Sequence, residues 1–584
     1  MSVNGDSSHQ PTGMFGRLIL FPFVFALCYL LMFGAEFPLP VPGLFRPALV
    51  IMAIMAALLL VISRFTSMPK AGLMILLLFL FLLPESGIVS HVVAVIISLV
   101  AGLAIGVASR LISKPARLAN FPSPGGHQAH FMWLREKLRL FLAPFLVLLI
   151  AMSYVTPEPS FPIGLVLGGI VIGFLGGRIR HVPTPGTSMV ATLNRGAIMV
   201  LALLTALWGM SGRINIDAPA TATDCPAGIH SGPNMYVFLL DAHASEGTLA
   251  RLYDYNLEPF LNGLETDGFY VDRQSHSNYI HTEETLASSL NFQPLQNQSS
   301  ITASWSQGMY SPFPIRTAIL NSAAANLLHC AGYQIAATET PMGLLSMTTA
   351  DQYINEGQIS ELEIALLQRL HLVPVINLIN PSLFDDIQRT RTLTELSDAV
   401  KLAQTPTSTP RFTWVHVLSP HFPPVFVADG PAPVRAGFTG SYFVDTAFEL
   451  KESPQAYMAD YQAQLAYIDK QMLTTEKAIV KADPSAVIMI FSDHGSGAYL
   501  DPLDPTKSDL GERFGNLFAV RTPGMSGIYT SPVTPLDMFG ILFNAYLGTN
   551  ISKNPEVDST WFGPITDNGK ITFPQVFPYG TPTP

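Results

Sequence analysis

Long apolar runs dominate the first 210 residues, whereas the remainder alternates short apolar segments with polar ones. A helix that crosses a bilayer needs about 20 mostly apolar residues. The clear candidates for such helices are residues 18–35, 47–63, 88–109, 138–155 and 162–177. Two shorter runs, 71–84 and 197–210, are marginal on length alone. The pattern predicts a multi-span α-helical membrane domain at the front of the chain.

Basic residues indicate how many of these runs cross the membrane. Cytoplasmic loops carry an excess of Lys and Arg. If all seven runs span and the N-terminus is cytoplasmic, nearly all basic residues of this part lie inside, and the outer loops hold Arg46 with Glu36, Glu85 and Glu158. We therefore predict about seven transmembrane helices and an outward C-terminal part. A bundle of five or six spans with a re-entrant hairpin near residues 71–109 is the alternative.

A polar, proline-containing stretch at residues 211–233 predicts a linker. It divides the chain into a transmembrane bundle (1–210), a soluble domain (234–560) and a C-terminal tail (561–584). With a cytoplasmic N-terminus, the chain is expected to be a multi-pass protein of the cytoplasmic (inner) membrane. Its C-terminal domain is expected to be periplasmic or otherwise extracytoplasmic.

Within the soluble part, short apolar runs end in residues that can carry chemistry. Residues 234–240 lead directly into Asp241, and residues 486–491 lead into Ser492-Asp493-His494-Gly495. Two further strands are predicted at 332–338 and 412–418, and a long amphipathic helix at 457–481. Strands that alternate with helices predict an α/β domain with a central, mostly parallel sheet and a site at the carboxyl ends of its strands.

Two carboxylates and one imidazole at such strand ends can converge on one metal ion. Asp241, Asp493 and His494 form a ligand set that suits Zn²⁺ or Mn²⁺ better than Ca²⁺. Each residue also has an ordinary explanation, because Asp and Gly are favoured in turns that follow strands.

Two more residues are candidates with similar alternatives. Thr282 precedes a helix-like stretch, where a hydroxyl near a metal can act as a nucleophile. Threonine is also a favoured helix N-cap, which explains Thr282 without any chemistry. His421 lies in a proline-flanked turn after a predicted strand, and His416 lies inside that strand, where a core position is the simpler interpretation.

Charge and cysteine content narrow the function classes. Residues 1–217 hold 14 Lys and Arg against 6 Asp and Glu, and the remainder holds 18 against 36. So acidic a soluble part argues against a nucleic-acid partner. Of the three cysteines, Cys28 lies in an apolar run, whereas Cys225 and Cys330 lie in the soluble part, where a disulfide and free thiols are both open.

Taken in order, these pieces resemble the sulfatase-like branch of the alkaline phosphatase superfamily. The similarity rests on the strand ending at Asp241, on Thr282 within YIHTEETLASSLN, on an HxPP-type turn at His421 and on SDHG after a late strand. It covers roughly residues 234–550 and includes GERFGNLFAV and SPVTPLDMFGILFNAYLG. Membrane-anchored members of this group include lipid A phosphoethanolamine transferases and lipoteichoic acid synthases.

The resemblance implies a role for each position. Thr282 matches the covalently loaded nucleophile and a further metal ligand. Asp241, Asp493 and His494 match the other ligands of one catalytic metal, Zn or Mn. His421 matches a histidine that contacts the transferred phosphoryl group. The chain departs from the group in carrying Asp241 where a Glu is frequent, and in lacking a further histidine shortly after DHG.

The function that this implies is a metal-dependent transfer of a phospho-head-group through a threonine intermediate. A membrane phospholipid is the expected donor, and an envelope glycan or lipid is the expected acceptor. The alternatives are hydrolysis of a phosphodiester or sulfate ester, and a non-catalytic binding or assembly role. Neither cysteine of the soluble part lies in the C/S-x-P-x-R motif of sulfatases that carry formylglycine, which weighs against sulfate-ester hydrolysis.

Overall fold

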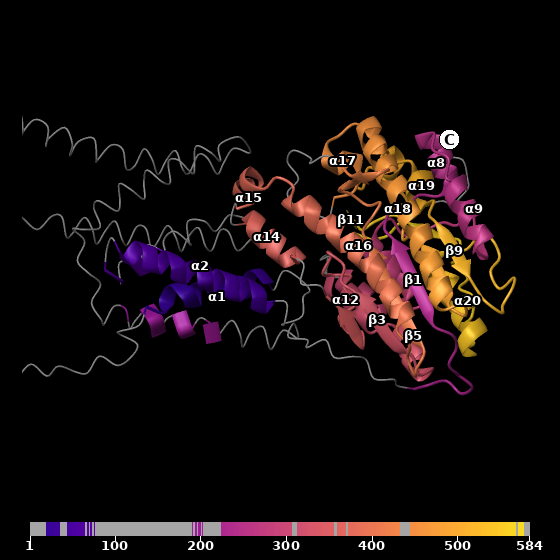
Figure 1. Cartoon of the computed structure of the whole chain (residues 1–584), viewed down its shortest axis with the longest axis horizontal. Helices are drawn as coiled ribbons and strands as arrows, with labels where there is room; N and C mark the ends of the chain where they lie inside the picture. Colours follow the sequence, from indigo (N-terminus) through magenta and orange to yellow (C-terminus); the bar gives the residue numbers. More distant parts are fainter. Residues whose placement is uncertain are drawn as a thin grey trace, which may run out of the picture. The chain divides into compact units, whose positions relative to one another are not determined.

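The computed structural model describes residues 19–34, 44–64, short pieces within 67–75 and 190–202, and most of 224–576 (Figure 1). The gaps in the last range are 306–311, 356–358, 370–371, 433–443 and 568–569. Three of the predicted spans, 88–109, 138–155 and 162–177, lie outside the described residues.

Two apolar helices lie in the N-terminal part. Helix α1 covers Phe21–Gly34, and α2 covers Phe45–Ser63. In the described residues, α2 is the one helix that is long and apolar enough to cross a membrane by itself. Its Leu49 and Leu60 are mostly exposed, and a helix that is apolar all round belongs either in a protein core or in a membrane. A membrane-crossing helix is thus supported, whereas the seven-span arrangement stays a prediction.

The C-terminal part is built on a mixed, mostly parallel sheet. In the described residues the sheet has seven strands in the order β2-β9-β8-β1-β5-β3-β4. The four neighbouring pairs from β8 to β4 are parallel, and β9 is antiparallel to both β8 and β2. The strands are β1 Met235–Leu240, β2 Phe269–Val271, β3 Gln334–Thr338, β4 Gln352–Ile354, β5 Arg411–Val417, β8 Val487–Phe491 and β9 Phe518–Arg521. The predicted α/β class is confirmed.

Central strand β1 shows why its run is apolar at every position. Met235, Val237 and Leu239 pack into the core on one face, whereas Tyr236 and Phe238 pack on the other. Successive side chains of a strand point to opposite faces, so a strand covered on both sides is continuously apolar. Its parallel neighbours β5 and β8 then end beside it, at the same edge of the sheet.

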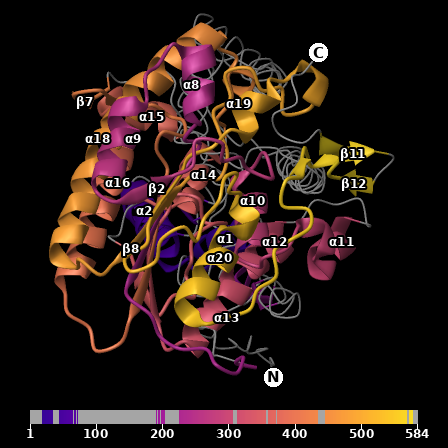
Figure 2. The same cartoon turned by 90° about the vertical axis from the view of Figure 1, so that its right-hand side faces the viewer.

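Helices cover both faces of the sheet (Figure 2). One face carries α8 Glu246–Tyr253, α9 Glu258–Thr266, α16 Leu383–Gln404 and α18 Pro454–Ala482. The other carries α10 Thr282–Ser289, α11 Ser299–Trp305, α12 Pro312–Leu320, α13 Ala323–Cys330 and α20 Pro535–Leu547. Short helices in the connections are α14 Glu361–Arg369, α15 Val373–Ile379, α17 Ala447–Leu450 and α19 Leu510–Phe514.

Short strand pairs complete the domain. They are β6 Phe426–Val427 with β7 Gly430–Pro431, β10 Thr560–Trp561 with β13 Gln575–Val576, and β11 Ile565–Asp567 with β12 Lys570–Thr572. Trp561, Ile571 and Phe573 are buried in the same core as the face that contains α10 and α20. The packing of this domain therefore continues to Phe573, within the segment expected to be a tail.

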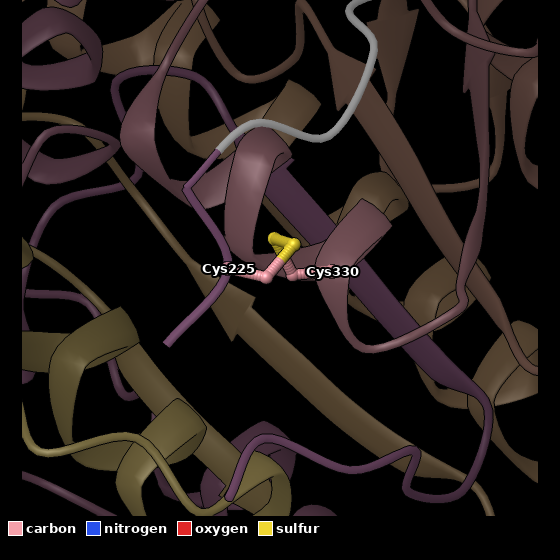
Figure 3. Close-up of a disulfide and its surroundings, with 2 residues drawn as sticks. All are labelled: Cys225 and Cys330. Carbon is pink, nitrogen blue, oxygen red and sulfur yellow. A yellow bond between two sulfur atoms is a disulfide. The ribbon is translucent and has the colours of Figure 1, made fainter. Parts of the chain in front are cut away.

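A disulfide joins Cys225 to Cys330, with their Cα atoms 5.4 Å apart (Figure 3). It ties the segment before β1 to the end of α13, across a sequence separation of 105 residues. The question that the sequence left open is thus answered by the fold. Disulfides persist in oxidising compartments, so the bond agrees with an extracytoplasmic domain.

Replacing both cysteines with serine is expected to lower the free energy of unfolding of this domain by roughly 2–5 kcal/mol, because a long cross-link restricts the unfolded chain. Denaturant unfolding followed by tryptophan fluorescence measures the change. A reducing agent should destabilise the wild type to a similar extent and leave the double variant unchanged. Equal stability of oxidised and reduced wild type would contradict the prediction.

Candidate metal and nucleophile site

The predicted site residues come from four places in the sequence and meet at one edge of the sheet. Asp241 follows β1, Asp493 and His494 follow β8, and His421 lies in the turn after β5. Backbone bonds hold two of these connections together: Asp241 N–H donates to Val417 O, and His421 N–H donates to Asp241 O, each over 3.0 Å. Helix α10 brings Thr282 to the same edge.

Three of these side chains form a ligand cluster. One ligand atom each from Asp241, Asp493 and His494 lies within 4.8 Å of the others, and all three residues are buried. Among the described residues, Asp241 Oδ1 and Asp493 Oδ2 have no hydrogen-bond partner. His494 Nε2 lies 3.1 Å from Asp493 Oδ2 and 3.9 Å from Asp241 Oδ1. Buried oxygens without partners are costly, so this arrangement fits a divalent cation.

The electrostatics of the cluster support the same conclusion. Burial, and then the negative charge of Asp493, raise the pKa of Asp241 well above its usual range. A divalent cation would stabilise both ionised carboxylates and offset their repulsion. The pKa of His494 is lowered to about 4, chiefly by burial and then by Arg513, which keeps the imidazole neutral. Its Nδ1–H donates to Gly495 O over 2.9 Å, so Nε2 has its lone pair directed into the cluster.

Asp241 is oriented by a histidine from the neighbouring strand. His416 Nε2–H donates to Asp241 Oδ2 over 2.9 Å, and both side chains are fully buried. Burial lowers the pKa of His416 to about 4, so the imidazole is neutral. The core position expected for His416 is confirmed, but the residue also holds a carboxylate of the site, in the way that metal ligands are commonly supported.

Thr282 is the first residue of α10, and His281 is its N-cap. The Thr282 hydroxyl lies 3.4 Å from His494 Nε2, so it faces the ligand cluster rather than capping the helix. Burial alone would raise the pKa of Asp493, but His494 and then Thr282 bring it below its usual value. The N-cap explanation of this threonine is therefore wrong.

His421 is held on one side and faces charged residues on the other. Its Nδ1–H donates to Phe422 O over 2.6 Å, and its Nε2 lies 3.8 Å from Asp445 Oδ2. Asp445 accepts from Arg513 Nη1 over 2.6 Å. Burial would raise the pKa of Asp445, but Arg513 and then His421 lower it well below its ordinary value. Asp445 is thus an ionised link between His421 and Arg513.

Gly495 of the SDHG segment is required by close packing. A Cβ at this position would lie 2.1 Å from Glu512 O and 2.6 Å from Gly515 O. Gly495 N–H also donates to Arg513 O over 2.7 Å. The missing side chain lets the segment after β8 lie directly against residues 512–515, which brings Arg513 to the ligand cluster.

Sequence reasoning missed Asp445 and Arg513, and it missed the contact that His416 makes with Asp241. Arg513 lies within GERFGNLFAV, a segment that the resemblance had already singled out. Asp445 stands in a stretch of ordinary composition, with no pattern that could have marked it.

Comparison with known proteins gives the family of this domain. The sulfatase family model matches residues 234–520. This region is a sulfatase-family domain. The matched residues include all five predicted site residues. The expectation of an enzyme of the alkaline phosphatase superfamily is confirmed. No curated protein matches the chain.

Solved structures similar to the sulfatase-family domain include transferases and sulfatases. The C-terminal periplasmic domain of EcEptC from Escherichia coli is 14% identical, with a TM-score of 0.37, over 61% of this chain and 96% of that one. Lipooligosaccharide phosphoethanolamine transferase A from Neisseria meningitidis is 12% identical, with a TM-score of 0.31, over 62% of this chain and 60% of that one. BT1596, a 2-O GAG sulfatase, is 12% identical, with a TM-score of 0.35, over 55% of this chain and 72% of that one.

Proposed function

We propose that this protein is a metal-dependent transferase that moves a phospho-head-group onto a cell-envelope glycan or lipid through a covalent threonine intermediate. One observation carries the proposal: the buried Thr282 hydroxyl lies 3.4 Å from His494 Nε2, beside Asp241 and Asp493. A hydroxyl at a cluster of metal-ligand type is positioned for attack on a phosphate or sulfate ester.

The site residues divide into ligands and groups that act on the ester. Asp241, Asp493, His494 and Thr282 would hold one Zn²⁺ or Mn²⁺, since two carboxylates, an imidazole and a hydroxyl oxygen suit either ion. A bound divalent ion lowers the pKa of a coordinated hydroxyl and offsets charge on phosphoryl oxygens. His421 faces the ester through Nε2, because its Nδ1–H is donated to Phe422 O.

Two displacements give a balanced reaction. Thr282 Oγ1 forms a bond to phosphorus as the bond from phosphorus to the lipid glycerol oxygen breaks. The threonine hydroxyl loses a proton in this step, and the departing alcohol gains one. The hydroxyl of an acceptor then attacks the same phosphorus, and the bond to Thr282 Oγ1 breaks and restores the hydroxyl. An intermediate of this kind predicts ping-pong kinetics.

The apolar N-terminal part, residues 1–210, supports a lipid donor. We propose that residues 1–210 form a bundle of about seven spans in the cytoplasmic membrane. The linker 211–233 would then hold the domain 234–560, with the segment 561–584, on the outer side. The membrane-crossing length of α2 and the disulfide of the domain support this arrangement. A membrane phospholipid is then the donor within reach, and an envelope glycan or lipid is the acceptor.

Peptide mass spectrometry of protein purified from its native membrane tests the proposal. The peptide that contains Thr282 is expected to carry a head-group adduct, whose mass identifies the donor. A His421→Ala variant should accumulate more of the adduct, because loss of this contact slows release. The transferase proposal fails if Thr282 stays unmodified in both proteins.

Hydrolysis is the second candidate, and the family match favours it. A phosphodiesterase of this type would show the same adduct on Thr282 but release the head group to water without any acceptor. Sulfate-ester hydrolysis through formylglycine is the weaker form, because Cys225 and Cys330 are joined in a disulfide and Cys28 lies in apolar helix α1. Release of head group in the absence of acceptor distinguishes hydrolase from transferase.

A further inference from the structure

Arg513 is a charged side chain buried at the edge of the ligand cluster. It is 1% exposed and lies at the end of α19, which places it within hydrogen-bond distance of His494. A buried guanidinium is costly unless its donors and its charge are matched. The partners of each nitrogen therefore indicate what this residue is for.

Two of the three nitrogens are used in ways that fix the side chain. Nε donates to Ile280 O over 2.7 Å, next to the start of α10. Nη1 donates to Asp445 Oδ2 over 2.6 Å and to Gly495 O over 3.2 Å. These bonds anchor the guanidinium to the segments that present Thr282 and His494.

The third nitrogen points into the site. Nη2 lies 3.3 Å from His494 Nε2, the same atom that lies 3.4 Å from Thr282 Oγ1 and 3.1 Å from Asp493 Oδ2. A cation that takes the lone pair of His494 Nε2 leaves the Nη2 hydrogen without this acceptor. Because Thr282 Oγ1 and Arg513 Nη2 both lie within 3.4 Å of His494 Nε2, an ester bound for attack by Thr282 would have its oxygens within reach of this hydrogen.

We infer that Arg513 binds a non-bridging oxygen of the tetrahedral anionic ester that Thr282 attacks. The inference rests on the proposed function and names a further residue that touches the substrate. It also accounts for the absence of a histidine shortly after DHG, because a guanidinium brought from α19 supplies a positively charged donor at this place. The ligand class is a phosphate or sulfate ester, since both present such oxygens.

Asp445 limits how strongly Arg513 attracts an anion. Its carboxylate holds Nη1 and carries a full negative charge, because the pKa of Asp445 lies well below its ordinary value through Arg513 and His421, despite burial. Removing this charge while keeping the side-chain shape should leave Arg513 more attractive to an anion. Asp445 and Arg513 variants therefore have opposite expected effects, which separates anion binding from simple bracing.

The test measures binding of inorganic phosphate and, separately, of inorganic sulfate to the zinc-loaded full-length protein in detergent, by isothermal titration calorimetry. Arg513→Gln is expected to weaken phosphate binding at least tenfold and to retain zinc binding. Asp445→Asn is expected to bind phosphate at least as tightly as the wild type does. Arg513→Lys keeps the positive charge opposite Asp445 and is expected to lie between the wild type and Arg513→Gln.

Three results would overturn the inference: equal weakening by Arg513→Gln and Asp445→Asn, phosphate binding to Arg513→Gln that matches the wild type, or weaker binding to Asp445→Asn alone. If Arg513→Gln does not fold, the comparison of Asp445→Asn and Arg513→Lys still decides. Tighter binding of phosphate or of sulfate indicates which ester class the site prefers. Because the assay needs no donor, acceptor or turnover, its result is independent of whether Thr282 ever carries a head group.

Discussion

Thr282→Ala is expected to abolish head-group transfer, with a loss on the order of 10⁴-fold or more, as is usual when a nucleophile is removed. The hydroxyl supplies the atom that bonds to phosphorus, and it lies 3.4 Å from His494 Nε2. Transfer of labelled head group from phospholipid vesicles to membrane acceptors measures the effect. The free energy of unfolding should change by less than about 1 kcal/mol, because a small side chain is shortened without a charge being left buried.

Two variants separate chemistry from folding in this experiment. Thr282→Ser keeps a hydroxyl and should retain measurable transfer. Thr474→Ala removes a hydroxyl that bonds only to Lys470 O on the exposed side of α18, and it should leave transfer unchanged. If Thr282→Ala retained wild-type transfer, or retained the cellular function in full, the domain would act as a non-catalytic binding module.

Asp241→Asn is expected to remove the response of the protein to zinc without destabilising its metal-free form. In the metal-free site, burial and the neighbouring charge of Asp493 raise the pKa of Asp241 and make its ionised form costly. A neutral amide relieves this cost and can still accept from His416. A ligand at 100 times its dissociation constant stabilises a protein by about 2.7 kcal/mol, and the variant should lose most of that gain. Thermal unfolding with zinc and with a chelator measures both effects.

A second buried Asp–His pair provides the matched control. Asp469, on α18, lies 3.0 Å from His243 Nε2 through its Oδ1, and neither residue belongs to the ligand cluster. Asp469→Asn should retain the full stabilisation by zinc. If Asp241→Asn responded to zinc as the wild type does, Asp241 would not be a metal ligand, and the cluster would serve only as a buried polar network.

The local parts of the site were readable from the sequence. The uninterrupted apolar runs before Asp241 and before Asp493 predict strands that are buried on both faces, and β1 and β8 are such strands. Parallel strands that begin on the same side must end on the same side, so the polar residues that follow them gather at one edge. The amphipathic pattern of residues 457–481 likewise predicts a long helix, and α18 covers Pro454–Ala482.

Other features were decided by tertiary structure alone, because they depend on contacts between distant segments. The sequence permitted a Cys225–Cys330 disulfide and free thiols equally, and the packing of the segment before β1 against α13 decided between them. Taken by itself, Thr282 was better explained as an N-cap, but the fold places His281 at that position and the Thr282 hydroxyl beside His494.

Asp445 and Arg513 show the same limit most clearly. They lie 68 residues apart in the chain, and Arg513 reaches Asp445 from a segment that packs directly against Gly495. The sequence by itself specifies local periodicity and the residues that end each strand. Long-range pairings of buried charges depend on the shape of the packed loops, which local patterns do not encode.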